Sequence, residues 1–221
     1  MDKKNLTILF LLFTSFTYGQ STGINTRKGE ISFGVRTTES LFRSSGNYFG
    51  IGAGWQVRYR MAEKLNTEWF ADWITTDIGG VGQRYDSHIG ESMIIYPGKK
   101  MGQKNTFTPF VLGGFCGDYT KIQANPIIDE ELNSNLKKSK DRWSFATQLG
   151  FGTHYNFTER FDISFTSQYV LHFGSDIDAQ VRTNDIGEKY LQIEKEKGSN
   201  LEGHIFITIS ANFVIADLCK K

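Results

Sequence analysis

The sequence has few cysteines and prolines and no excess of charge of either sign. Two cysteines, Cys116 and Cys219, cannot form the dense disulfide framework of a small secreted domain. Lys and Arg number 25 against 24 Asp and Glu, so there is no basic excess to bind nucleic acid through its phosphates. The chain is 39% hydrophobic, which is low for a helical membrane protein. Its 14% aromatic content argues against a disordered chain.

Residues 1–19 are predicted to be a secretory signal peptide. Lys3 and Lys4 form a basic start, Leu6–Phe16 is apolar, and the small Gly19 precedes the expected cleavage before Gln20. The apolar part is only about half of the ~20 residues that a spanning helix needs, which favours a signal over a membrane anchor. No cysteine follows at the position of a lipoprotein anchor, and every later stretch of twenty residues contains charges. Residues 20–221 are therefore expected to form one exported domain without a transmembrane helix.

The strongest pattern in the exported domain is an alternation of period two. In Arg142–Phe157, every second residue is apolar or aromatic, and the residues between them are small or polar. The same alternation runs through Phe161–Gly174 and through Glu202–Ile215, where Phe206 is the exception. Period two indicates β-strands. These strands exceed ten residues, whereas strands of soluble proteins usually have about five or six.

The chemistry of the two faces indicates which one points inward. In Tyr48–Met61, the large side chains of Phe49, Ile51 and Trp55 alternate with glycines and with polar residues. A polar face made of glycines and small residues suits a narrow lumen, while an apolar face with aromatic ends suits lipid. A soluble lipocalin-like barrel has the same period with the two faces exchanged, and it remains the alternative.

Eight such strands are predicted, forming an all-β, eight-stranded, antiparallel up-and-down transmembrane β-barrel. The predicted strands are Gly29–Thr37, Tyr48–Met61, Leu65–Thr76, Ser87–Pro97, Asn105–Tyr119, Arg142–Phe157, Phe161–Gly174 and Glu202–Ile215. In Ser87–Pro97 the register is ambiguous, because Ile94 and Ile95 compete for the lipid face. Short and long connections alternate, which is typical of barrels with short periplasmic turns and long extracellular loops. The expected short connections are Ala62–Lys64, Gly98–Lys104 and Thr158–Arg160, and the long ones are Thr38–Asn47, Asp77–Asp86, Lys121–Asp141 and Ser175–Leu201.

With a signal peptide, eight alternating strands and a last strand rich in Ile and Phe, the chain resembles the small outer-membrane β-barrels of the OmpA/OmpX-like family. The ending Tyr18-Gly19-Gln20 is similar to signals of exported Bacteroidetes proteins. The resemblance implies a location in the outer membrane of a Gram-negative cell and carries no catalytic motif. One departure is that many such barrels end on an aromatic residue, whereas Phe213 is followed here by a tail ending at Lys221.

Two histidines are the most specific candidates for a catalytic or metal-binding site. By parity, His172 and His204 both face inward, on neighbouring strands and near the outer rim, with Glu202 and Asp176 close in sequence. A metal site or an acid–base cluster is one interpretation. An ordinary polar contact in the lumen is the favoured one, and no residue is assigned as catalytic, cofactor-binding or metal-ligating.

A rim enzyme acting on lipid A is the least favoured class. Certain outer-membrane barrels are lipid A deacylases, in which a histidine is followed closely by Ser-Asn. His172 is followed by Phe-Gly-Ser without an asparagine, which is the wrong spacing. His154 lies beside a predicted periplasmic turn, too far to join the pair, and His88 is expected in a loop or at the rim.

Charges on the inner face are expected to fill the lumen. Eight strands enclose only enough space for side chains, and the inward charges are Glu30, Arg36, Arg58, Arg60, Glu68 and Asp72. Across the turn Ala62–Lys64, position 58 should oppose about position 68, so Arg58 and Glu68 are the expected pair, with Arg60 and Asp72 more distant. Cys116 and Cys219 should lie too far apart for a disulfide and are expected to be free thiols.

The connections with mixed charge are where a specific function is expected. Lys121–Asp141 contains Asp129-Glu130-Glu131 and a basic run 137–140, and Lys189–Glu194 could extend the last strand as a hairpin. The favoured function is a structural or interaction barrel with a filled, non-conducting lumen. The alternative is a transport-related barrel, either a narrow pore or an accessory component of a secretion or gliding apparatus. The expected partners are outer-membrane lipid, lipopolysaccharide and an envelope protein, with a monomeric chain, no nucleic acid and no cofactor.

Overall fold

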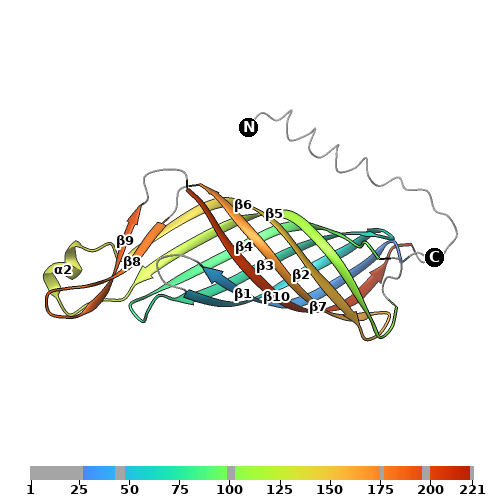
Figure 1. Cartoon of the computed structure of the whole chain (residues 1–221), viewed down its shortest axis with the longest axis horizontal. Coiled ribbons are helices and arrows are strands. Elements are labelled where there is room, and N and C mark those ends of the chain that lie inside the picture. The colour runs from blue at the N-terminus through green and yellow to red at the C-terminus, as the bar shows by residue number, and fades with distance from the viewer. Residues whose placement is uncertain (1–26, 43–47, 99–102, 175–176, 196–199, 220–221) are drawn as a thin grey trace, which may run out of the picture.

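The structure is a computed structural model that describes residues 27–42, 48–98, 103–174, 177–195 and 200–219. Eight strands of this described chain close into an antiparallel barrel in the order β1-β10-β7-β6-β5-β4-β3-β2 (Figure 1). Their bounds are β1 Glu30–Phe42, β2 Tyr48–Ala62, β3 Leu65–Asp77, β4 Gly82–Ile95, β5 Thr106–Ala124, β6 Ser139–Asn156, β7 Phe161–Gly174 and β10 Asn200–Asp217. The predicted fold class and strand order are confirmed. The signal peptide and the Tyr18-Gly19-Gln20 ending lie outside the described residues.

Pairing of the first and last strands closes the barrel. β1 pairs with β10 from Glu30↔Asp217 to Phe42↔His204, and with β2 on its other side. Closure leaves no open sheet edge among these eight strands, which is the condition for a sheet in lipid. We call the end where β1 begins and β10 finishes the terminal end, at the right of Figure 1, and the opposite end the hairpin end. No helix among the described residues is long and apolar enough to cross a membrane.

The two faces of the wall are distributed as the alternation predicts. On β6, Phe151 is 65% exposed on the outer surface, whereas Gln148 is 4% exposed and points into the lumen. The ambiguous register of β4 is settled in the same way, because Ile94 is buried inside and Ile95 is exposed outside. The apolar outer face is therefore the one that contacts lipid, and the lumen receives the polar side chains.

The strands extend further toward the hairpin end than the sequence suggests. β4 begins at Gly82 instead of Ser87, and β5 continues to Ala124 instead of Tyr119. Between β3 and β4, only residues 78–81 remain as a connection, whereas 96–105 between β4 and β5 is longer. The predicted alternation of short and long connections is therefore wrong for these two. Gly79 and Gly80 adopt φ of +61° and +75°, a conformation that glycine favours, and this allows the tight turn.

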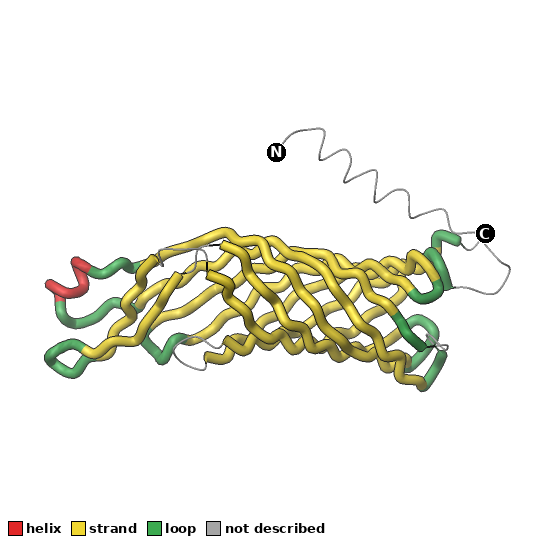
Figure 2. The backbone as a smooth tube through the Cα atoms, turned by 45° about the horizontal axis from the view of Figure 1, so that its top comes forward, coloured by secondary structure: helices red, strands yellow, loops and turns green. Residues whose placement is uncertain are grey.

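The connection between β7 and β10 carries a separate hairpin. β8 (Ile177–Thr183) pairs with β9 (Lys189–Lys195) as a two-stranded sheet. The segment 189–194 therefore lies in a hairpin, as expected, but it pairs with β8 and does not extend the last barrel strand. Apolar side chains explain the arrangement. Those of the hairpin pack with buried residues of β5 and of the β3–β4 turn, in a cluster of Ile78, Ile122, Ile177, Leu191 and Ile193. The short helix α2 (Glu130–Asn135) lies beside the hairpin, beyond the ends of the barrel strands (Figures 1 and 2).

A closed barrel should remain folded in mild detergent and migrate differently from the heat-denatured chain on a gel. We expect unheated and heated samples to give two separate bands, because every barrel strand is hydrogen-bonded along both sides. The measurement is electrophoresis of the exported protein, taken from the outer-membrane fraction. A single band at all temperatures, with the protein in the soluble fraction, would contradict the transmembrane barrel.

Candidate functional site: ion pairs and histidines in the lumen

The terminal half of the lumen is filled by a network of buried ion pairs. Arg58 Nη2 lies 3.1 Å from Glu68 Oε2, and Arg58 Nη1 lies 3.5 Å from Asp162 Oδ2. The Arg58↔Glu68 register is as predicted from the turn, and Arg60 lies opposite Asn66. Each charge in the network therefore has a partner of opposite sign in the water-poor interior, which offsets the cost of burying it.

Asp72 pairs with Arg36, a partner that the sequence did not assign to it. Its Oδ1 lies 3.1 Å from Nε of Arg36 on β1, whereas Arg60 lies 3.9 Å from Glu30 at the terminal end. Arg36 and Asp72 both pair in register with Gly54 of the intervening strand β2. A Cβ at position 54 would lie 2.2 Å from Asp72 Oδ1, so glycine is what allows the ion pair to form across this strand.

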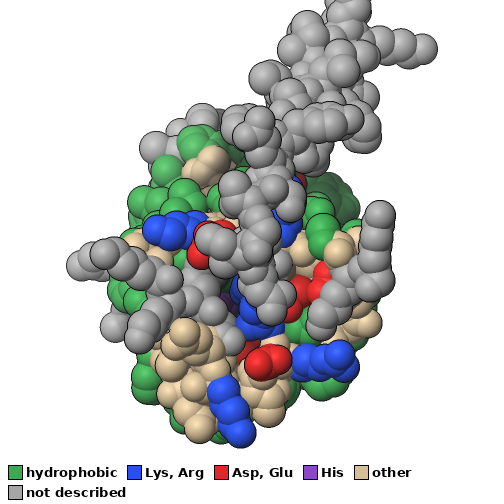
Figure 3. All heavy atoms as spheres, turned by 90° about the vertical axis from the view of Figure 1, so that its right-hand side faces the viewer, with side chains coloured by type: hydrophobic (Ala, Val, Ile, Leu, Met, Phe, Trp, Pro, Cys, Tyr) green, Lys and Arg blue, Asp and Glu red, His purple; other side chains and the backbone are tan. Residues whose placement is uncertain are grey.

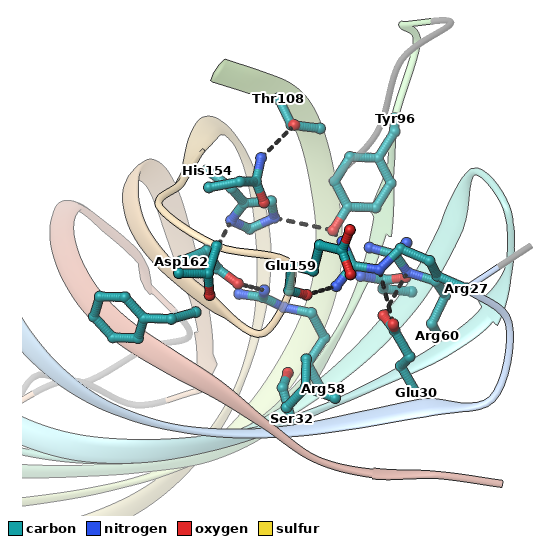
Figure 4. Close-up of a pocket in the computed structure, with 15 residues that line it drawn as sticks. Arg27, Glu30, Ser32, Arg58, Arg60, Tyr96, Thr108, His154, Glu159 and Asp162 are labelled. Atoms are coloured by element: carbon teal, nitrogen blue, oxygen red, sulfur yellow. Dashed lines mark hydrogen bonds and ion pairs between the residues drawn. The ribbon is translucent and has the colours of Figure 1, made fainter. Parts of the chain in front are cut away.

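A second polar cluster closes the terminal end (Figure 4). His154 Nε2 lies 2.9 Å from the Tyr96 hydroxyl, and its Nδ1 lies 2.6 Å from Ser164 Oγ. At the mouth, Arg27 contacts Glu30 and donates to the Glu159 carbonyl. The cavity between these groups has a volume of about 30 Å³, which is room for only a few water molecules. Seen from this end, charged side chains of both signs lie across the face and hydrophobic ones lie mainly around its edge (Figure 3).

An apolar layer crosses the middle of the lumen, where the alternation of the sequence predicts polar side chains. It consists of Phe70, Ile74, Cys116, Ala146, Val170 and Phe206, all buried. Phe206, the exception in the alternation of the last strand, is thus a lumen residue with a packing role. Cys116 in this layer and the exposed Cys219 are both free, as expected.

Beyond the apolar layer, toward the hairpin end, three histidines meet an aspartate. His88, His172 and His204 are 0%, 1% and 2% exposed. Nε2 of His172 and Nε2 of His204 are 3.2 Å apart. Asp118 Oδ2 lies 3.0 Å from His172 Nδ1, and Asp118 Oδ1 lies 3.1 Å from His88 Nε2. Ser144 Oγ also reaches Asp118 Oδ2, at 3.2 Å.

The histidine cluster agrees in part with what the sequence predicts. His172 and His204 face inward and touch, as predicted, and His154 lies apart from them. His88 is not at the rim but within β4, because the strand begins at Gly82. Asp176 and the side chain of Glu202, proposed as neighbours, lie outside the described part of the chain. Asp118 was missed, although its register opposite His88 and Ser144 follows once both strands are extended to their full length.

A closed barrel with an apolar outer surface and a polar, packed interior defines a transmembrane β-barrel protein. Residues 8–188 match the family model of the outer membrane protein beta-barrel domain. The chain therefore belongs to this family of Gram-negative envelope proteins and is located in the cell outer membrane.

Solved structures share the architecture at low sequence identity. Neisserial surface protein A aligns with a TM-score of 0.54 and 11% identity, covering 84% of this chain and 97% of that one. A major outer membrane protein from Thermus thermophilus aligns with a TM-score of 0.52 and 11% identity, covering 83% and 98%. At such identity the likeness concerns the fold alone. No curated protein sequence matches the chain.

Proposed function

We propose that this protein is a non-conducting barrel that serves the outer membrane structurally and contacts other envelope components through its hairpin end. Residues 1–19 would direct export and be removed, and the terminal end would face the periplasm. The observation that carries the proposal is the filled lumen, in which ion pairs, an apolar layer and the histidine cluster follow one another along the axis. Because side chains fill the lumen, the exposed segments beyond the strands are the parts of the protein that can contact other molecules. No residue is assigned a catalytic role.

The hairpin packs against one side of the barrel at its hairpin end. Its buried residues Ile177, Leu191 and Ile193 pack against Ile78 and Ile122. That contact joins the hairpin to the β3–β4 turn and to β5. An ion crossing the barrel would have to pass the apolar layer and the buried ion pairs of the lumen.

Two exposed isoleucines mark the outermost surface as an interaction site. Ile128, before α2, is 84% exposed, and Ile186, in the turn between β8 and β9, is 71% exposed. The two segments touch, since the Ile128 backbone N–H donates to Glu188 Oε1 at 2.8 Å. Large apolar side chains exposed beyond the membrane, among charges of mixed sign, suit contact with a protein or with lipopolysaccharide.

Conductance tests the filled lumen. We expect the wild-type protein to give no stable channels in planar bilayers, and we expect the same when the hairpin is shortened by replacing 177–195 with a short Gly-Ser linker. The reason is that the apolar layer and the ion pairs remain in place without the hairpin. Large, stable openings of the wild type would instead support the pore alternative, and openings of the shortened variant alone would make the hairpin the sole barrier.

Site-specific photo-crosslinking tests the interaction surface. A crosslinking residue at Ile186 should capture a component of the outer membrane in intact cells, and one at Ile128 should capture the same component. Thr183 on the hairpin, also exposed, is the matched control and should capture less. Absence of any crosslink from 128 and 186, or equal crosslinks from all three positions, would contradict the proposed surface. A change in lipid A mass caused by the wild type would instead favour the rim enzyme.

A further inference from the structure

We propose that His88, His172 and His204 form a binding site for a divalent transition-metal ion of the zinc class inside the lumen, with Asp118 as the residue that orients His172. One ring nitrogen from each histidine can be chosen so that the three lie within 4.8 Å of one another. The site is separate from the exposed surface of the proposed function and does not depend on it.

The separation of two of the nitrogens already suits a shared ion. Zinc binds histidine nitrogen at about 2.0–2.1 Å in tetrahedral geometry, so two ligand atoms should be about 3.3–3.4 Å apart. His172 Nε2 and His204 Nε2 lie 3.2 Å apart. The three nitrogens lie within 4.8 Å of one another, so bringing the His88 nitrogen to this separation shortens its distance by up to about 1.5 Å, which a rotation of the ring can supply.

Asp118 prepares His172 to be a ligand. Its carboxylate lies 3.0 Å from Nδ1 of His172, which favours the tautomer with the proton on Nδ1. Nε2 then carries the lone pair, and it points toward His204. Metal-bound histidines commonly donate their second N–H to a carboxylate in this way, which fixes the ring and raises its basicity. The carboxylate is held in turn by Ser144 Oγ and by Thr120 Oγ1, at 3.2 Å and 3.4 Å.

His88 supplies an independent observation. It is fully buried, and neither of its ring nitrogens makes a hydrogen bond of good geometry among the described residues, although Nε2 lies 3.1 Å from Asp118 Oδ1. Buried polar atoms without a hydrogen bond are uncommon and costly. A metal ion bound between the three rings would give one of these nitrogens a partner and leave the other to Asp118.

The surroundings favour a fixed, dehydrated site. The three histidines come from β4, β7 and β10 of one closed barrel, so their backbones cannot move far apart. Phe206 packs edge-on to His88, with centroids 4.9 Å apart, and against His204 at 4.6 Å, and the apolar layer lies beneath. Imidazole ligands suit Zn²⁺, Cu²⁺ and Ni²⁺, whereas Mg²⁺ and Ca²⁺ prefer oxygen. Selectivity for the first group over the second is therefore expected.

Titration of the tag-free, full-length barrel with ZnCl₂ in detergent tests the proposal. The protein is first treated with a chelator, and a parallel sample is refolded with zinc present, so that a closed mouth cannot hide the site. Binding is measured by calorimetry. We expect saturation at one zinc ion per chain and no saturation with MgCl₂. Binding at many ions per chain without saturation, or equal binding of magnesium, would overturn the site.

Substitutions of the histidines test which residues bind the ion. His172→Gln and His204→Gln should abolish the stoichiometric binding, and Asp118→Asn should weaken it by about 10–100-fold. His154→Gln, a buried histidine near the terminal end, is the matched control and should bind as the wild type does. Unchanged binding in His172→Gln would overturn the proposal.

Folding of each variant is checked by its unheated band. If a histidine variant does not fold, Cu²⁺ bound to the wild type provides a second measurement. Its electron paramagnetic resonance spectrum should show coupling to imidazole nitrogens, and a spectrum of oxygen ligands alone would contradict the site.

Discussion

Replacing Arg58 with alanine is expected to be among the most destabilising single substitutions in the lumen, lowering the free energy of unfolding by about 3–5 kcal/mol. Arg58 lies between two acids, Glu68 at 3.1 Å and Asp162 at 3.5 Å, and is itself buried. Its removal leaves both carboxylates in the water-poor interior with less compensation. The measurement is urea unfolding of the barrel in lipid vesicles, followed by the unheated band and by tryptophan fluorescence.

Two further variants separate this network effect from loss of a basic residue in general. Arg60→Ala, on the same strand, removes a side chain that is 14% exposed at the mouth and whose single ion-pair contact among the described residues, with Glu30, is 3.9 Å long. Because this long contact lies beside solvent, its loss should cost about 1 kcal/mol. Glu68→Ala should cost less than Arg58→Ala, because Arg58 keeps Asp162 and Arg36 keeps Asp72. Equal effects of Arg58→Ala and Arg60→Ala would show that the lumen is hydrated and that the network contributes little.

The pairing of Arg58 with Glu68 could be predicted because it depends on a local feature. A short turn fixes the register of the two strands that it connects, and alternation then fixes which side chains face inward. The same reasoning assigned Phe151 to the lipid face and Gln148 to the lumen. Contacts of this kind need only two neighbouring strands and the sequence between them.

Contacts that depend on more than one pair of strands were beyond this reasoning. Arg36 reaches Asp72 across Gly54, so the partner is set by a third strand that has no side chain at the crossing point. The histidine cluster joins strands β4, β7 and β10 across the lumen, and its geometry follows from the curvature of the closed barrel. Alternation shows that such residues face inward but not which of them meet.

The start of β4 explains why His88 was placed at the rim. Gly79-Gly80 and the polar residues that follow suggest a loop as far as Asp86, yet the strand begins at Gly82. Within 82–86, Arg84 and Asp86 are both buried and lie 2.9 Å apart. A strand whose inward side chains are charged and paired has the composition of a loop. Hydrophobic periodicity therefore does not predict the polar start of such a strand.

Placing an arginine on the lipid-facing side of β6 is expected to have an effect of similar size on assembly. Phe151 is 65% exposed on the outer surface and lies about halfway along the span of ~9–11 residues that crosses a bilayer, counted from the terminal end. Phe151→Arg should therefore destabilise the inserted barrel by about 2–4 kcal/mol, because the charge is placed near the bilayer midplane.

Phe107→Arg is the matched control, since Phe107 is 68% exposed but lies at the start of β5, where an arginine reaches the membrane interface and should cost about 0–1 kcal/mol. The measurement is the fraction of each variant that folds into lipid vesicles, read from the unheated band, with Phe151→Leu to show that loss of the aromatic ring alone is tolerated. Equal folding of the two arginine variants would mean that position 151 does not lie near the midplane, and full folding of both would contradict the assignment of this face to lipid.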